Sequence, residues 1–433
     1  MKKSAVALKY YKIADTNTPL PFSGSNFLNF YSPTFDGKGV AFYGNNLNRE
    51  GIYYAMVGQP TGPVGSPTIV RVSDSQTPIA ALNGPPTTND SLQPPRDAYV
   101  SYLPDSALSP CNSDLDQPRP LILNEGIAFF AANWQTNTYG IFSFNTTSTS
   151  ITPLVTNTGI GGNFSTFSQP TGALNMVCFS GINPSSTGVF TMPIVGGTGG
   201  DKQLLNIANA VTPDGQHIAE FGNSQIQPLL PESTVFVFGR QQPSGNEAIY
   251  SCRGNSLQYV IKPGQNIGGY TVPTGTGTVW HEFSQAGNMV VLQTQLNDSE
   301  QNPWAAVVAA TVQGGTVGTP QLICISTPQP APGGGIFSGN AFATPPVTDG
   351  KRIAFSAQYE EGFRTDLVGL YVWGPSTAGK VVRVMDATSQ VDGQLVTGID
   401  ITNSSFVDGM LAVMLQLGDS GSQAVYLVDL SMY

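Results

Sequence analysis

The chain has 433 residues, of which 40% are hydrophobic and only 11% are charged, and its formal net charge is −10. This apolar content supports a large core, whereas the acidic balance and the lack of a basic run argue against nucleic-acid binding. No stretch of about 18 apolar residues occurs, so we expect no membrane-spanning helix. A surface with so few charges consists largely of Asn, Gln, Ser, Thr and Gly, which favours an extracellular or a cell- or particle-surface location. The first residues contain too short an apolar run to predict a signal peptide.

Short runs rich in Val, Ile, Phe, Tyr and Thr follow one another along the chain, separated by turns that draw on 49 Gly and 33 Pro residues. Such runs predict β-strands, and no long segment has the periodicity of a helix. The first predicted strand, residues 7–13, stands alone, because no related strand precedes it. The pattern as a whole indicates an all-β fold.

After this first strand, a two-strand unit repeats seven times. Its first strand, b, contains an apolar triplet, at residues 40–42, 127–129, 177–179, 236–238, 290–292, 353–355 and 411–413. Its second strand, c, contains a small residue, an aliphatic residue and usually an aromatic residue, at residues 51–53, 140–142, 188–190, 248–250, 306–308, 369–371 and 424–426. Seven copies of one unit predict a repeat fold.

Two more strands complete each repeat: a strand a before b, and a strand d after c. No strand d follows the seventh c, so the strand at residues 7–13 is expected to pair there. We therefore predict a single β-propeller domain over residues 1–433, with seven four-stranded antiparallel blades and a ring closed by the N-terminal strand. The closing strand is expected at residues 5–14 and the blades at residues 22–73, 97–156, 162–208, 216–262, 278–326, 336–386 and 396–430.

Two of the turns between strands a and b resemble the TolB-type family of β-propeller repeats. Residues 35–42 (FDGKGVAF) and 348–355 (TDGKRIAF) are similar to the Asp-Gly-Lys-x-Ile-Ala-Phe hairpin of that family, in which Asp-Gly forms the turn. The other repeats keep only the apolar part. The resemblance implies the fold of the whole chain but no particular activity, because the family includes periplasmic scaffolds, peptidase accessory propellers and some lyases.

Strand a is expected to line the central channel. Its channel-facing positions are predicted to be Asn29, Ser101, Thr166, Glu220, Glu282, Ala341 and Asp400. A Ca²⁺ ion would relieve the repulsion between Glu220, Glu282 and Asp400, and Asn29 could add a carbonyl ligand. In ligand type this set resembles that of calcium-dependent lactonase propellers, so a metal-dependent hydrolase or lactonase is the alternative function. The simpler interpretation is a hydrated channel with separated carboxylates.

The b–c loops are expected on the same side of the ring as the connections from d to a. Their residues include Trp134, Trp304, Tyr359 and Phe363 beside Arg49, Arg240 and Arg364. Aromatic residues and Arg on a rigid rim are typical of protein interfaces, and such aromatics also suit a carbohydrate. No catalytic constellation accompanies them, because the Gly-Asp-Ser-Gly segment at residues 418–421 lacks the partner histidine motif of serine proteases. We therefore expect a non-catalytic binding or structural module for a protein or a glycan, with Trp134, Arg240, Trp304, Tyr359 and Arg364 as contact residues.

Overall fold

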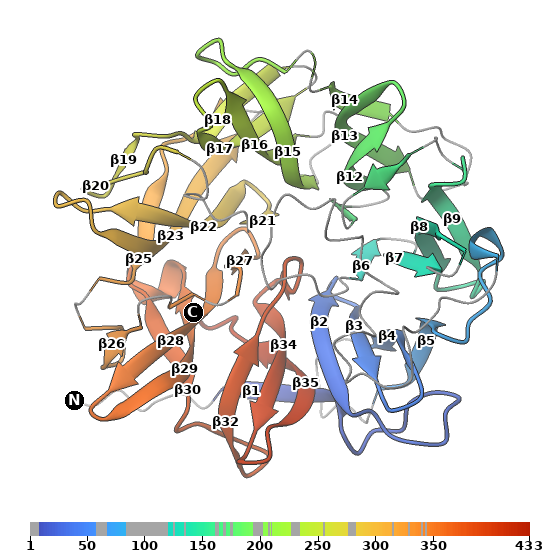
Figure 1. The fold of residues 1–433 in the computed structure, drawn as a ribbon. Helices are drawn as coiled ribbons and strands as arrows, with labels where there is room; N and C mark the ends of the chain where they lie inside the picture. The colour runs from blue at the N-terminus through green and yellow to red at the C-terminus, as the bar shows by residue number, and fades with distance from the viewer. Residues whose placement is uncertain are drawn as a thin grey trace.

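The computed structural model describes residues 8–57, 67–83, 120–123, 126–133, 136–160, 164–167, 170–173, 176–193, 202–206, 208, 210–226, 234–253, 256–275, 283–313, 316–327, 330–338, 341–342 and 344–433. The strands in this part of the chain form seven antiparallel sheets. Figure 1 shows the sheets arranged as blades around a central axis, which confirms the predicted β-propeller. Among the described residues, no helix is both long enough and apolar enough to cross a membrane.

Strands b and c pair with each other in every sheet, and all fourteen contain the predicted triplets. The b strands are β3 (Gly39–Asn45), β7 (Gly126–Asn133), β12 (Met176–Asn183), β16 (Val235–Gln242), β22 (Met289–Asn297), β28 (Ile353–Glu361) and β34 (Met410–Leu417). The c strands are β4 (Glu50–Met56), β8 (Thr138–Asn145), β13 (Ser186–Pro193), β17 (Glu247–Arg253), β23 (Pro303–Gln313), β29 (Arg364–Trp373) and β35 (Ser422–Asp429).

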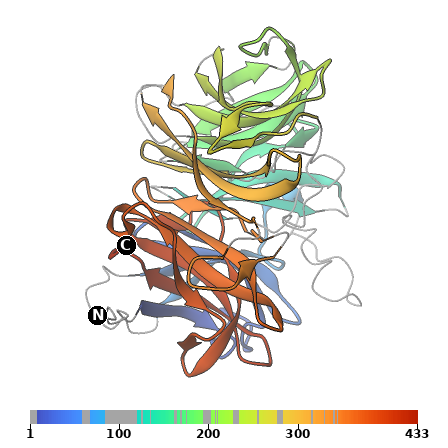
Figure 2. The ribbon, with the colours of Figure 1, turned by 90° about the vertical axis from the view of Figure 1, so that its left-hand side faces the viewer.

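The outer strand of the last sheet comes from the other end of the chain, as the unpaired first strand predicted. Strand β1 (Lys9–Asp15) pairs with β35 from Lys9 opposite Asp429 to Asp15 opposite Ala424. Figure 2 shows this dark blue strand beside the red strands of the last sheet. The other d strands are β5 (Ile69–Asp74), β9 (Ile151–Thr156), β14 (Lys202–Asn206), β18 (Ser256–Ile261), β25 (Gln321–Ile325) and β30 (Val382–Asp386).

The inner strands precede strand b in each sheet, and most are bulged or divided. In the first sheet, the register of β2 shifts between Tyr31 and Thr34, where Pro33 lacks a backbone N–H to donate. The inner strands are β2 (Asn29–Phe35), β6 (Leu121–Leu123), β10 (Thr166–Phe167), β11 (Thr171–Ala173), β15 (His217–Ile226), β21 (Phe283–Ala286), β26 (Ile336–Phe337), β27 (Val347–Thr348), β32 (Gln394–Asp400) and β33 (Phe406–Val407). Short strands β19 (Asn266–Ile267), β20 (Tyr270–Thr271), β24 (Thr316–Val317) and β31 (Gln390–Val391) and the 3₁₀ turns η1 (Ala80–Leu82) and η5 (Pro375–Thr377) complete the described elements.

The core lies between neighbouring sheets. On β3, Phe42 packs in a cluster with Leu427 of the last sheet, whereas Tyr43 packs in a cluster with Phe129 of the second sheet. Successive side chains of a strand point to opposite faces, so each blade contributes to two interfaces. Aromatic side chains of the inner segments are buried in these interfaces, at Phe30, Phe283 and Phe342. The blades therefore stabilise one another, and the turns at their ends are held by a rigid ring.

Candidate functional site

One side of the ring carries both the b–c turns and the connections from d to a, and we call it the loop face. It comprises the b–c turns together with the strand ends beside them, within the described parts of residues 46–49, 134–137, 182–187, 243–246, 298–302, 361–364 and 418–421. It also comprises the d-to-a connections together with the short strands and strand ends beside them, within the described parts of residues 16–28, 75–83, 157–165, 207–216, 262–275, 326–337 and 387–396. Both sets begin or end at paired strands, which fixes their positions.

Tyr359 is not an exposed loop residue, which corrects the expectation drawn from the sequence. Strand β28 continues to Glu361, and alternation directs the Tyr359 ring into the core, where it is 1% exposed. The guanidinium of Arg383 lies 4.3 Å from the ring centroid and donates hydrogen bonds to the carbonyls of Gly333 and Gly334. Burial raises the pKa of the Tyr359 hydroxyl. Tyr359 is therefore a support beneath the turn at residues 361–364.

The Arg240 and Trp304 side chains each bind another residue of their own hairpin. Arg240 donates to Glu247 Oε1 through Nε at 3.2 Å and Nη2 at 3.0 Å, and the Glu247 side chain is buried. The half-buried Trp304 donates its indole N–H to Asp298 Oδ2 at 3.0 Å. Asp298 also accepts hydrogen bonds from Asn302, and together these lower the pKa of its carboxyl to about 2. Both side chains stabilise their own turns, so they have fewer hydrogen-bond donors left for a ligand.

Arg364 is exposed on the loop face, whereas Trp134 lies outside the described residues. The neighbour of Arg364 in the turn, Phe363, is fully exposed. This turn joins two long strands, β28 and β29, and Glu361 pairs with Arg364 at its base. Of the five predicted contact residues, Arg364 is thus the one whose exposed side chain the structure describes.

The predicted calcium ligands fall on inner strands, but only part of the set is described. Asp400 is half-buried on β32, and Asn29 on β2 donates its amide to Asn45 Oδ1 at 3.0 Å. Glu220 lies on β15 with its side chain outside the described atoms, and Glu282 lies outside the described residues. Among the described residues, no group of three His, Cys, Asp or Glu side chains could hold a metal. The calcium site stays a prediction.

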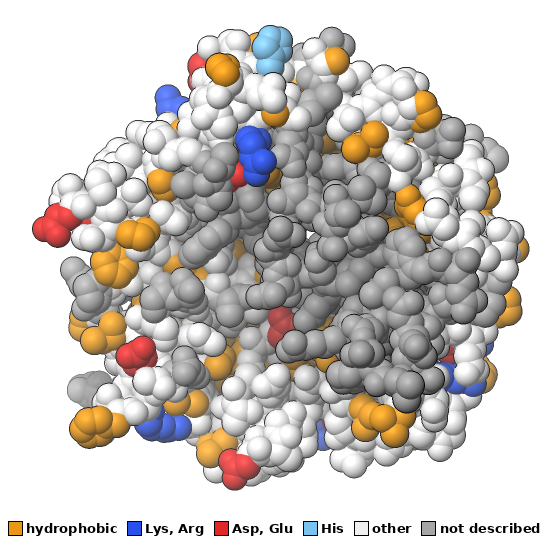
Figure 3. Space-filling view, viewed as in Figure 1, with side chains coloured by type: hydrophobic (Ala, Val, Ile, Leu, Met, Phe, Trp, Pro, Cys, Tyr) orange, Lys and Arg blue, Asp and Glu red, His pale blue; other side chains and the backbone are white. Residues whose placement is uncertain are grey.

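Exposed apolar side chains are concentrated on the loop face. Nine of the twelve exposed large hydrophobic residues of the described chain lie there: Phe22, Leu28, Leu47, Ile160, Ile182, Val211, Ile336, Phe363 and Leu395. The remaining three lie elsewhere: Met56, Val70 and Met432. Figure 3 shows one face of the molecule, with hydrophobic side chains in separate patches around its periphery and few charged groups between them.

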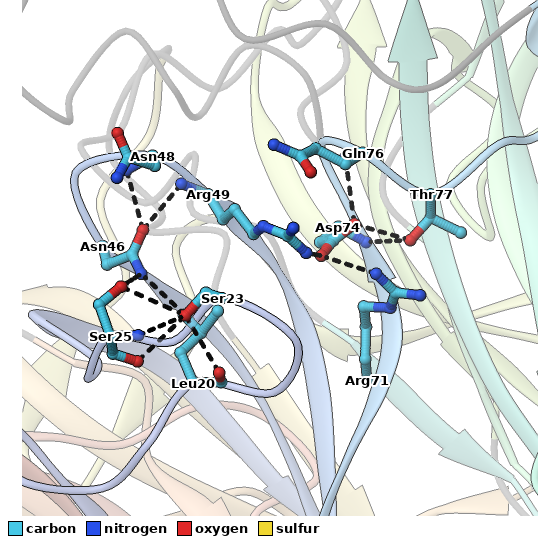
Figure 4. A network of polar contacts seen from close by, with 10 residues as sticks. All are labelled: Leu20, Ser23, Ser25, Asn46, Asn48, Arg49, Arg71, Asp74, Gln76 and Thr77. Atoms are coloured by element: carbon cyan, nitrogen blue, oxygen red, sulfur yellow. Dashed lines mark hydrogen bonds and ion pairs between the residues drawn. The ribbon is translucent and has the colours of Figure 1, made fainter.

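A polar network supports the loop face at the first blade (Figure 4). Asp74, at the end of β5, is completely buried, and its Oδ2 lies 3.2 Å from Nη1 of both Arg49 and Arg71. Its Oδ1 accepts hydrogen bonds from the hydroxyl of Thr77 and the backbone N–H of Gln76. The opposite charges and these donors stabilise the ionised carboxylate in its buried position.

The same turn recurs in two other blades and was missed from the sequence. An Asp at the end of strand d pairs with a basic residue three positions earlier and bonds a Thr or Ser three positions later. The three copies are Lys12–Asp15–Thr18, Arg71–Asp74–Thr77 and Arg383–Asp386–Ser389. This spacing could have been read from the sequence. It explains why connections from d to a are well fixed in these blades.

A groove of about 600 Å³ lies at the edge of the second blade. Its lining is mainly apolar and comes from the segment around η1 and from strand β9 and its flanking turns: Thr77, Pro78, Ile79, Ala80, Ala81, Thr149, Ile151, Pro153 and Ile160. Pro153 lies within β9, where it removes one backbone donor from this outermost strand. The groove is therefore a poor place for an added β-strand.

Comparison with known proteins shows the fold alone. No protein-family model and no curated protein matches the chain. A prolyl endopeptidase structure is similar with a TM-score of 0.50 and 10% identity, over 94% of this chain and 47% of that one. An oligogalacturonate lyase in complex with manganese gives 0.49 and 10%, over 98% and 97% of the chains. The β-propeller domain of the Trilobed protease from Pyrococcus furiosus gives 0.48 and 12%, over 93% of each.

Proposed function

We propose that this chain is a non-catalytic β-propeller that binds another protein through its loop face. The observation that carries the proposal is the one-sided distribution of exposed apolar side chains, nine of which lie on that face among the described residues. Single exposed hydrophobic residues are common on any protein, but their concentration on one side favours an interaction surface. The low charge content supports a place for this interaction outside the cell or on a cell or particle surface.

A protein partner fits these side chains better than a glycan does. Sugars are bound by exposed aromatic rings with free polar groups beside them, but Tyr359 is buried and the Trp304 indole N–H is bonded to Asp298. The exposed set consists instead of Phe, Leu, Ile and Val, which contribute to protein interfaces by burial of apolar area. Phe363 and Leu47 lie at the tips of rigid hairpins, so their positions cost little conformational entropy on binding.

Selection of a phage-displayed library of random peptides on the immobilised full chain tests the proposal. The loop-face variant carries Phe22→Ser, Leu47→Ser and Phe363→Ser, and the matched control carries Met56→Ser, Val70→Ser and Met432→Ser. We expect selected peptides to bind the loop-face variant at least about tenfold more weakly and to bind the control unchanged. Selection of no binder, or of binders that only the control variant weakens, would contradict the proposal.

A calcium titration separates this proposal from the calcium-dependent alternative. The proposal predicts the same Tm in Ca²⁺ and in a chelator. A rise in Tm with Ca²⁺ that Asp400→Asn abolishes would favour the channel site instead, because a ligand that binds only the folded state stabilises it.

A further inference from the structure

The segment that precedes β2 holds a phenylalanine in an unfavourable and exposed position. Phe22 has a φ of 63° and is 74% exposed. The left-handed region is rare for a bulky residue and strains its backbone. The loop is nevertheless well fixed, because the Leu20 N–H donates to the Ser25 carbonyl and the Ser23 N–H donates back to the Leu20 carbonyl. The fold thus maintains an exposed aromatic ring against both backbone strain and the hydrophobic effect.

A charged group packs against the Phe22 ring and holds it in position. The guanidinium carbon of Arg71 lies 4.5 Å from the ring centroid, within the range of a cation–π interaction. Arg71 is itself fixed on the buried Asp74 carboxylate, which also holds Arg49. A chain of contacts therefore joins the exposed ring to the end of strand β5.

A second hairpin brings another apolar side chain to the same place. The amide of Asn46 donates to Ser25 Oγ at 2.8 Å and to Ser23 Oγ at 3.4 Å (Figure 4). Phe22 precedes Ser23 in the chain, and Leu47, 88% exposed, follows Asn46. The two exposed side chains therefore flank one hydrogen-bonded contact between their loops.

The charged atoms at this place are presented to solvent unequally. The side chains of Arg49 and Arg71 are 17% and 27% exposed, whereas that of Asp74 is 0% exposed. Within the described part of the chain, each guanidinium is bonded to Asp74 through Nη1, and a guanidinium has five N–H donors. An approaching partner therefore meets two apolar groups and the remaining donors of two cations, on a chain whose net charge is −10.

We propose that Phe22, Leu47, Arg49 and Arg71, the Phe22 patch, bind a segment of a partner protein in which a carboxylate lies next to an apolar side chain. The apolar side chain packs on Phe22 and Leu47, and the carboxylate accepts hydrogen bonds from the guanidinium groups. This inference rests on the proposed protein-binding function and specifies the chemistry of its partner. The strain at Phe22 is consistent with such a role, since strained residues persist mainly where the surrounding fold and a function require them.

An array of short synthetic peptides tests the inference on the full chain. Each peptide has a central Leu, Phe, Ile or Met, and Asp, Asn or Lys replaces each flanking position in turn. We expect Asp-flanked peptides to bind at least about tenfold more tightly than their isosteric Asn counterparts, with a preference that weakens as salt is raised. We also expect Phe22→Ser, Leu47→Ser and Arg71→Gln each to weaken the binding of these peptides severalfold.

Met56→Ser is the matched control, because it removes an exposed apolar side chain that lies away from the loop face, and it is expected to leave binding unchanged. Leu47 is so exposed that its replacement does not endanger folding. If Arg71→Gln unfolds, Leu47→Ser therefore still tests whether the peptides bind at the Phe22 patch. Binding with no preference for Asp, or binding unaffected at positions 22 and 47, would overturn the inference. If peptides bound without these preferences but lost binding to the loop-face variant, the proposed function would stand and only the inference about the Phe22 patch would fail. If no peptide bound at all, both the proposed function and this inference would fail.

Discussion

The carboxylate of Asp349 accepts the backbone N–H of Gly409 at 2.9 Å and so joins the sixth blade to the seventh. Its other oxygen accepts the backbone N–H groups of Lys351 and Arg352 and closes the turn between β27 and β28. The Arg352 guanidinium pairs with Asp349 Oδ2 at 2.8 Å and donates to the carbonyl of Ser431 near the C-terminus. One Asp-Gly turn therefore connects a hairpin, the next blade and the end of the chain.

The corresponding turn of the first blade provides a matched comparison. Asp36 accepts the backbone N–H groups of Lys38 and Gly39 in the same way, without an ion pair among the described residues. We expect Asp349→Ala to lower the free energy of unfolding by about 2 kcal/mol more than Asp36→Ala, because it also leaves Arg352 and Gly409 without their partner. Urea denaturation of the two variants measures this difference. Equal losses would show that the bonds between blades contribute nothing beyond the turn.

A cluster of charged side chains fixes the closing strand, β1, to the last blade. Lys12 Nζ on β1 lies 3.0 Å from Asp15 and 2.5 Å from Asp392, which also accepts the hydroxyl of Tyr426. Burial alone would raise the pKa of Asp392, but the hydrogen bonds from Lys12 and Tyr426 outweigh it and lower the pKa below its usual value. The pKa of Asp15 is lowered against burial in the same way, by Lys12 and Thr18.

This cluster predicts a pH dependence of stability. A carboxyl whose pKa is lower in the folded state contributes stability above its unfolded pKa, about pH 4, and this stability is lost as the pH falls through the folded value. Lys12→Met should therefore lower stability at pH 7 by less than about 1 kcal/mol, since the side chains are partly exposed, and the difference should shrink below about pH 4. Thermal unfolding from pH 3 to 7 measures this, with Lys9→Met on the same strand as control. A difference independent of pH would contradict the assignment.

The architecture could be predicted from the sequence because strands b and c are buried on both sides. Their apolar triplets leave a clear pattern, and the unpaired strand at the N-terminus revealed how the ring closes. The downstream parts of the inner strands left no such pattern. Val347–Thr348 and Phe406–Val407 have two residues each, and β2 contains Pro33 at its bulge. Their pairing is imposed by strand b rather than by their own propensities.

The candidate site was harder to predict because exposure depends on the exact length of each hairpin. Tyr359 was expected in a loop, but β28 extends past it and its side chain alternates into the core with Phe355 and Ala357. Phe22 could not be singled out from the sequence. Neither its positive φ nor its contact with Arg71, which lies almost 50 residues away in sequence, leaves a recognisable pattern. Composition pointed to the loop face, and tertiary contacts decided which of its residues are exposed.

The buried cysteines lead to a prediction about reactivity. Cys178, Cys252 and Cys324 are buried thiols, and burial raises the pKa of Cys252 and of Cys324 to about 12. Because the thiolate is the reactive form, we expect no alkylation of these three residues by iodoacetamide at pH 8 in the folded protein and complete alkylation in guanidinium chloride. Peptide mass spectrometry after each reaction reports every site separately. Rapid labelling of any of the three in the folded state would contradict its burial.

The strain at Phe22 can be measured by comparing two substitutions at one position. Phe22→Ala removes the ring but keeps a Cβ at a φ of 63°, whereas Phe22→Gly removes both the ring and the steric cost. We expect the Gly variant to be more stable than the Ala variant by about 1 kcal/mol in urea denaturation, although both lose the contact with Arg71. At Phe363, which does not have a positive φ, Gly should instead be no more stable than Ala. The same order at both positions would show that the Phe22 backbone is unstrained, and the argument that the fold maintains this residue for binding would lose its energetic support.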